Sequence, residues 1–149
     1  MTDLVLACLH HLLVFSLAAI LAAEIATVRP GLAGASLKRL AIVDAHYGAV
    51  ATLVIVVGVL RAIYGTKGPA FYLPNPMFWA KMSAFALVAI LSIQPTVRIL
   101  QWRRKSKADT AFTLSAEEAG RARRFLIAEA CVFAFIPLFA AAMARGVGL

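Results

Sequence analysis

Eight ionisable side chains interrupt the long apolar stretches of this 149-residue chain. A charged group costs about 2.5–3.5 kcal/mol at the centre of a membrane-spanning helix, so such groups usually face other helices and mark functional positions. Counted at about 1.5 Å of rise per helical residue, their depths divide them into two sets. The first set, expected near one membrane surface, is His10, His11, Arg61 and Lys81.

The first set combines imidazole with two cations, which is the chemistry of a haem site. Either His10 or His11 would be the axial ligand of the iron, and Arg61 and Lys81 would neutralise the propionates. The two histidines lie about 100° apart around a helix, so both cannot point at one partner. The alternatives are a histidine hydrogen-bonded to a neighbouring helix, and cations that extend to the membrane surface. Haem b is the expected cofactor.

The second set, expected near the opposite surface, is Glu24, Asp44, His46 and Glu129. Its three carboxyl groups could form a proton path, or could pair with His46 or with Arg98. His46 is also a third candidate metal ligand. The depth estimate separates it from His10 by roughly 12 Å along the membrane normal, which argues against one haem held by both histidines.

Four apolar segments must position these side chains, at about 4–28, 40–64, 78–102 and 122–144. A bilayer core of about 30 Å requires roughly 20 helical residues per crossing, and continuous apolar runs favour helices over the strands of a membrane barrel. With 62% hydrophobic residues and a mean hydropathy of +0.87, the chain is too apolar for a water-soluble domain of its length. The sequence predicts one all-α transmembrane domain over 1–149, an integral membrane four-helix bundle.

The basic residues predict an orientation. Eleven Lys and Arg residues lie in or beside the first and third loops, whereas the opposite side has Arg61, Lys67, Lys81 and Arg145. The positive-inside rule then places both termini in the periplasm of a bacterial inner membrane. Cations of the third loop are expected to contact anionic lipids. Although the net charge is +8, its position beside apolar runs makes the bilayer, and not nucleic acid, the expected partner.

Short motifs give two further expectations. Ser115 followed by Glu118 is a capping box, so the fourth helix is expected to begin before the membrane. Cys8 and Cys131 lie in apolar runs without CxxC spacing and are expected to be packed small hydrophobes. No Gly-rich phosphate loop, nucleophile elbow or paired zinc motif is present, which argues against a hydrolase or an NTP-driven enzyme. Whether the chain is an enzyme at all stays open.

Part of the sequence resembles a known family. The stretch Asp44-Ala45-His46-Tyr47-Gly48, then Gly58 and Arg61, then Lys67-Gly68-Pro69-Ala70-Phe71-Tyr72 and Asn75-Pro76-Met77-Phe78-Trp79-Ala80-Lys81, resembles small bacterial four-helix membrane proteins of unknown function. That resemblance covers most of the chain and implies a fold but no activity.

A weaker resemblance involves Leu9-His10-His11 and Phe78-Trp79-Ala80-Lys81. These residues are similar to those of the small bacterial membrane protoporphyrinogen oxidase and its copper-resistance relatives. This similarity implies that His10 binds haem and that Lys81, with Arg61 beside it, binds an anionic group of a tetrapyrrole. The adjacent His11 and the acidic set depart from the oxidase pattern, so the similarity extends to tetrapyrrole binding and not to the oxidase reaction.

Three functions from different classes are consistent with these residues. The leading hypothesis is a haem-b-binding bundle in electron transfer or tetrapyrrole redox chemistry. The second is a structural or accessory subunit of a larger membrane complex, in which the ionisable groups pair helices. The third is a small ion or metal transporter, acting as a homo-oligomer, in which the second set is the relay.

Overall fold

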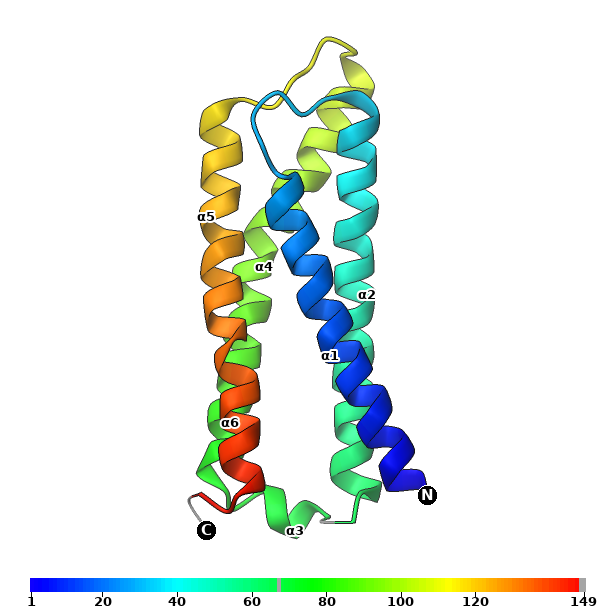
Figure 1. Ribbon diagram of the computed structural model, residues 1–149. Helices are drawn as coiled ribbons and strands as arrows, with labels where there is room; N and C mark the ends of the chain where they lie inside the picture. The colour runs from blue at the N-terminus through cyan, green and yellow to red at the C-terminus, as the bar shows by residue number, and fades with distance from the viewer. Residues whose placement is uncertain (67, 148–149) are drawn as a thin grey trace.

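The computed structural model describes residues 1–66 and 68–147; Lys67, one of the cations used to predict the orientation, lies outside this part. The described chain is helical apart from its connections. The helices are α1 (Thr2–Thr27), α2 (Gly34–Tyr64), α3 (Pro69–Tyr72), α4 (Pro76–Ala108), α5 (Ala116–Phe133) and α6 (Phe135–Ala144). Four stretches are long and apolar enough to cross a membrane, namely α1, α2, α4, and α5 together with α6. The predicted four-helix membrane bundle is therefore confirmed (Figure 1).

Three of the four spans are longer than hydropathy predicts, each at the end that adjoins connection 28–33 or 109–115. Helix α2 begins at Gly34, α4 continues to Ala108 and α5 begins at Ala116. Hydropathy reports the lipid-embedded part of a helix, whereas its polar ends continue into the interface. The N-cap half of the predicted capping box is confirmed, because Ser115 Oγ accepts a hydrogen bond from Glu118 N at 3.2 Å. The Glu118 side chain accepts from the Ser115 hydroxyl at 3.2 Å, in place of the backbone N–H of a full capping box.

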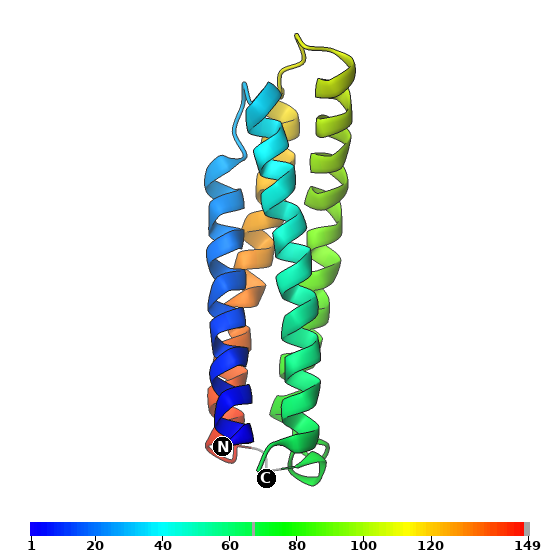
Figure 2. The same cartoon turned by 90° about the vertical axis from the view of Figure 1, so that its right-hand side faces the viewer.

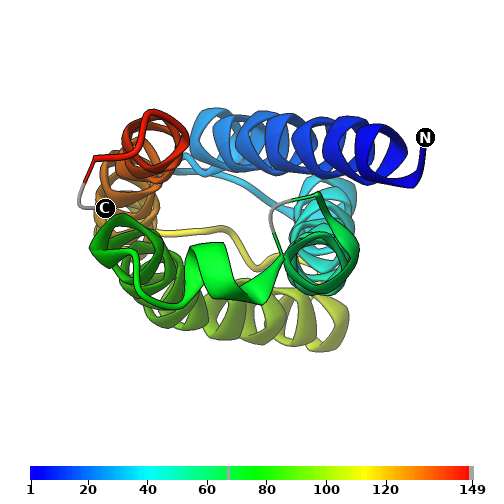
Figure 3. The same ribbon diagram turned by 90° about the horizontal axis from the view of Figure 1, so that it is seen from below.

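The two ends of the bundle contain different parts of the chain (Figures 1 and 2). The start of α1, the end of α6 and the short helix α3 lie at one end, which we call the terminal end. The connections 28–33 and 109–115 lie at the other, which we call the loop end. In the bundle, α1 and α4 each pack against both α2 and α5, as the view from below shows (Figure 3).

The loop end is closed by contacts between its two connections. Gly31 N donates to Leu114 O at 2.8 Å, and Leu114 N donates to Leu32 O at 2.9 Å. Both leucines are buried, and an isolated antiparallel bridge joins Ala33 to Thr113. These bonds fix the ends of α1, α2, α4 and α5 relative to one another.

The apolar core is concentrated near the loop end. Its main cluster includes Leu40, Ile99, Trp102 and Leu126, each at most 1% exposed. A smaller cluster towards the terminal end joins Ala84 and Val88 of α4 to Ile136 of α6.

The outward faces of the spans carry apolar side chains, as expected where helices contact lipid. Cys8 and Cys131 lie on these outward faces, so the prediction that they are packed in the interior is wrong. Their hydrophobicity suits contact with lipid as well as contact with protein, and apolar composition alone does not distinguish the two.

Candidate functional site

Three carboxyl groups lie inside the bundle. Glu24 of α1, Asp44 of α2 and Glu129 of α5 are 2%, 6% and 0% exposed, and we call them the buried acidic cluster. Glu24 interacts electrostatically with both other carboxyl groups, and Glu129 also interacts with Asp44. The fold thus brings together all three acidic residues of the second set.

Two hydroxyl groups bind the buried acidic cluster. The Tyr47 hydroxyl donates a hydrogen bond to Glu129 Oε1, and Thr96 Oγ1 of α4 donates one to Asp44 Oδ1 at 2.7 Å. Glu24 Oε1 and Glu129 Oε2 are buried without a hydrogen-bond partner in the described structure. All four spans therefore contribute a polar side chain to this place, and two carboxyl oxygens there are free to bind something else.

No cation pairs with the buried acidic cluster within the described residues. The ion pairs of the described residues join Lys105 to Glu118 at 3.5 Å and Arg121 to Glu117 at 2.9 Å, and both lie near the loop end, outside the cluster. Arg98, a predicted alternative partner, instead donates to its neighbour Gln101. Unpaired carboxylates are costly in a low-dielectric interior, so protons or a small cation must neutralise them.

The oxygen atoms of the buried acidic cluster can hold protons. Among residues 1–66 and 68–147, no group of three or more His, Cys, Asp or Glu side chains is arranged to hold a metal. A proton needs only one oxygen and a nearby acceptor, which the free oxygens of Glu24 and Glu129 supply.

His46 is not part of this cluster. Its ring Nδ1 lies 2.7 Å from the Ile42 carbonyl oxygen, and its side chain is exposed. It follows Asp44 by two positions, which places the two side chains about 200° apart around α2. His46 and Asp44 therefore lie at a similar depth but on different faces of α2.

A second group lies towards the terminal end. His10 of α1, Arg61 of α2 and Lys81 of α4 are half-buried, and we call them the basic cluster. His10 interacts electrostatically with both cations, and Lys81 interacts with Arg61. His10 Nδ1 and Arg61 Nε are buried without a partner in the described structure. Glu24 follows His10 by fourteen residues on α1, about 21 Å along the helix, so the two clusters are separate sites.

His10 is held by close packing of two helices. A Cβ atom added at Gly58 of α2 would lie 3.2 Å from His10 Cε1, tighter than most real contacts. The Lys81 ammonium group lies 5.3 Å from the centre of the Phe78 ring, within the range of a cation–π contact. His11 is exposed, and its Nδ1 lies 2.6 Å from the Ala7 carbonyl oxygen. Three of the four residues of the first set are thus together.

Tyr47 and Thr96 are site residues that the sequence patterns do not single out. Tyr47 follows Asp44 by three positions, so helical periodicity places both on one face of α2. That spacing is a signal by which Tyr47 could be found. Thr96 cannot be found in this way, because its hydrogen bond depends on how α4 is rotated against α2.

Comparison with known proteins places the chain in a family. The model of a family described as predicted membrane proteins, DUF2214, matches residues 2–148. The chain belongs to this family. The match confirms the resemblance carried by the stretch from Asp44 to Lys81, and the family description names no activity. No curated protein and no solved structure matched, and the resemblance to protoporphyrinogen oxidase gains no support from these comparisons.

Proposed function

We propose that this chain is a proton-handling membrane protein, in its simplest form a small proton-coupled transporter. The observation that carries the proposal is the buried acidic cluster. Three carboxyl groups from three spans lie in the interior without an ion pair in the described structure, and two of their oxygens have no partner. Ionisable groups of this kind inside membrane bundles are typical of proton relays.

We infer a separate role for each carboxyl group from its hydrogen bonds. Tyr47 donates to one oxygen of Glu129, and Thr96 donates to one oxygen of Asp44, so these two carboxyl groups are fixed in position. Glu24 has no such donor for its buried oxygen and is the member best able to gain and lose a proton. The free oxygen of Glu129 would be the acceptor in the next step. A bundle of four spans has little room for a pathway of its own, which favours a homo-oligomer as the working unit.

Proton flux in liposomes tests this function. Purified full-length protein would be reconstituted with a pH-sensitive dye inside, and a potassium gradient with valinomycin would drive protons. We expect flux above that of empty liposomes, and its loss in Glu24→Gln. Glu117→Gln is the matched control, because it removes an exposed acid near the loop end. Flux equal to that of empty liposomes, or full flux in Glu24→Gln, would reject the proposal.

The basic cluster favours a second function, haem b binding in electron transfer or tetrapyrrole redox chemistry. When bound, haem would supply a one-electron redox centre. The cluster fits that group in part: His10 offers an imidazole with an unpartnered nitrogen, and Arg61 and Lys81 offer cations for two propionates. His10 would be the only histidine ligand, because His11 bonds its own helix and His46 lies on the other side of α2 from the interior.

A visible spectrum separates this second function from the first. Purified protein from haem-replete cells would be measured oxidised and reduced, with a pyridine haemochrome assay on the same sample. We expect a b-type signal that is lost in His10→Ala and retained in His11→Ala. A colourless protein, or full haem in His10→Ala, would reject haem binding at this cluster and leave the flux experiment unaffected. Partners that co-purify with a colourless, flux-inactive protein would instead favour an accessory subunit.

A further inference from the structure

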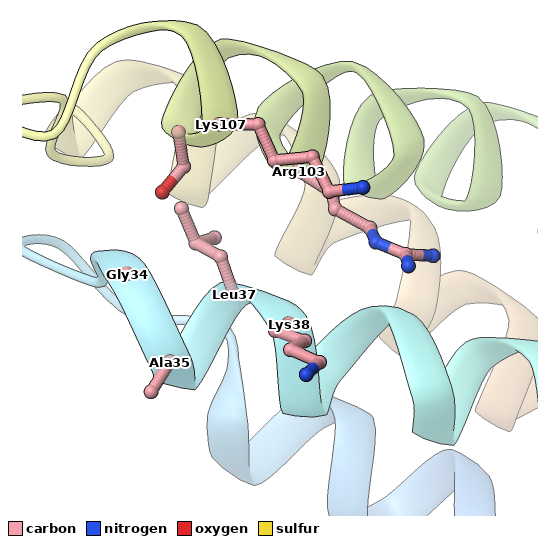
Figure 4. A pocket seen from close by; sticks show the side chains of 7 residues that line it. Gly34, Ala35, Leu37, Lys38, Arg103 and Lys107 are labelled. Atoms are coloured by element: carbon pink, nitrogen blue, oxygen red, sulfur yellow. The ribbon is translucent and has the colours of Figure 1, made fainter.

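A hollow of about 210 Å³ lies at the loop end, between the start of α2 and the end of α4 (Figure 4). We call it the α2–α4 hollow. Neither the buried acidic cluster nor the basic cluster contributes to its wall. The residues that line it are Gly34, Ala35, Leu37, Lys38, Arg103, Ser106 and Lys107.

The charge of the hollow is positive and uncompensated. Lys38, Arg103 and Lys107 are three of its seven lining residues, and no lining residue is acidic. None of the three is in an ion pair in the described structure, whereas Lys105 on the same helix pairs with Glu118. The Nε atom of Arg103 is also buried without a hydrogen-bond partner there. Residues of two helices thus line one hollow, and each helix contributes a cation that has no ion pair in the described structure (Figure 4).

The start of α2 adds to this positive potential. No side chain caps this helix, and its first turn contains no acidic residue. The free N–H groups of a helix start and the positive end of its dipole attract anions. Gly34 has φ +46°, a conformation that favours glycine, and a Cβ there would have no atom within 4 Å, so the backbone is open to a ligand.

We propose that the α2–α4 hollow binds the phosphate of an anionic phospholipid headgroup. The hollow lies where two membrane-spanning helices end, which is the level of the headgroups, and Leu37 and Ala35 give it an apolar wall beside the cations. Basic pockets between spans at this level bind such headgroups through several cations at once. Ser106 supplies a hydroxyl that can donate to a phosphate oxygen.

The test is native mass spectrometry of delipidated protein titrated with phosphatidylglycerol and, separately, with phosphatidylcholine. The hollow variant is Lys38→Gln/Arg103→Gln. The matched control is Arg39→Gln/Arg104→Gln, which removes the same charge from exposed neighbours on the same helices that do not line the hollow. We expect the natural protein to bind phosphatidylglycerol more tightly than phosphatidylcholine. The hollow variant should bind phosphatidylglycerol about tenfold more weakly than the natural protein does, and the control variant should bind it within about twofold of the natural affinity.

Three outcomes would overturn the proposal. Equal losses in both variants would mean that net charge alone attracts the lipid. Equal affinity for the two lipids would mean that the anionic headgroup is not recognised. Displacement of phosphatidylglycerol by inorganic phosphate at equal concentration would mean that the hollow is a site for a free anion and not for a lipid. Size-exclusion profiles of both variants matching that of the natural protein exclude misfolding as the cause of any loss.

Discussion

The hydroxyl of Tyr47 on α2 donates a hydrogen bond to Oε1 of Glu129 on α5, 82 positions later in the chain. Both residues are buried, at 5% and 0% exposed. Because α2 and α5 each pack against α1 and α4, this bond crosses the middle of the bundle. It links two helices through a polar contact inside a membrane domain, where water is not available to replace it.

Removal of this hydroxyl should destabilise the bundle. We expect Tyr47→Phe to lower the free energy of unfolding by about 1–3 kcal/mol, because Glu129 then has no donor on either oxygen. Tyr64→Phe is the control, since Tyr64 is 67% exposed. Unfolding in mixed micelles at increasing dodecyl sulfate measures both variants. Equal stability of Tyr47→Phe and the natural protein would show that the bond contributes nothing.

The hydrogen bond from Thr96 to Asp44 makes a parallel prediction. Thr96→Val keeps the shape of the side chain but removes the donor at 2.7 Å, so we expect a loss of about 1–3 kcal/mol in the same assay. Thr52→Val is the matched control, because Thr52 is exposed and bonds only the Gly48 carbonyl of its own helix. If both variants lose the same amount, threonine removal itself and not the bond to Asp44 is responsible.

The contact between Gly58 and His10 predicts a coupling between two helices. Relative to Gly48→Ala, whose Cβ meets no atom within 4 Å, Gly58→Ala should cost about 1 kcal/mol, because its new methyl group would lie 3.2 Å from the His10 ring. Both changes gain about 0.5–1 kcal/mol from the helix preference for alanine over glycine, so the comparison isolates the contact with His10. In a His10→Ala background the cost of Gly58→Ala should largely disappear, and a double-mutant cycle measures that difference. Additive effects would mean that His10 does not pack on Gly58.

These contacts show what can be predicted from the sequence. The spans and the depth of each ionisable residue follow from hydropathy and helical rise, which is why the amino-acid sequence alone groups His10, Arg61 and Lys81. Hydropathy and helical rise do not give the rotation of a helix about its axis, which decides the side chains that face the interior. His46 shares the depth of Asp44 and yet faces away from it.

Contacts between distant parts of the chain do not follow from local sequence patterns. Tyr47 reaches Glu129 only because α2 and α5 lie diagonally in the bundle, and no local pattern records which helices are neighbours. The α2–α4 hollow depends in the same way on the relative height of two helix ends. Hydropathy underestimates the lengths of those ends, because polar residues continue both helices beyond the apolar segments.

The membrane orientation is the last prediction, and cysteine labelling tests it. In a Cys8→Ser/Cys131→Ser background, single cysteines would replace Thr110 in the α4–α5 connection or Ala70 in α3, both exposed. The excess of Lys and Arg beside the loop end predicts that this end is cytoplasmic. A membrane-impermeant maleimide should therefore label Ala70→Cys in intact spheroplasts, and Thr110→Cys only after permeabilisation. The reverse pattern would place the buried acidic cluster nearer the periplasm and the α2–α4 hollow against the outer leaflet of the membrane.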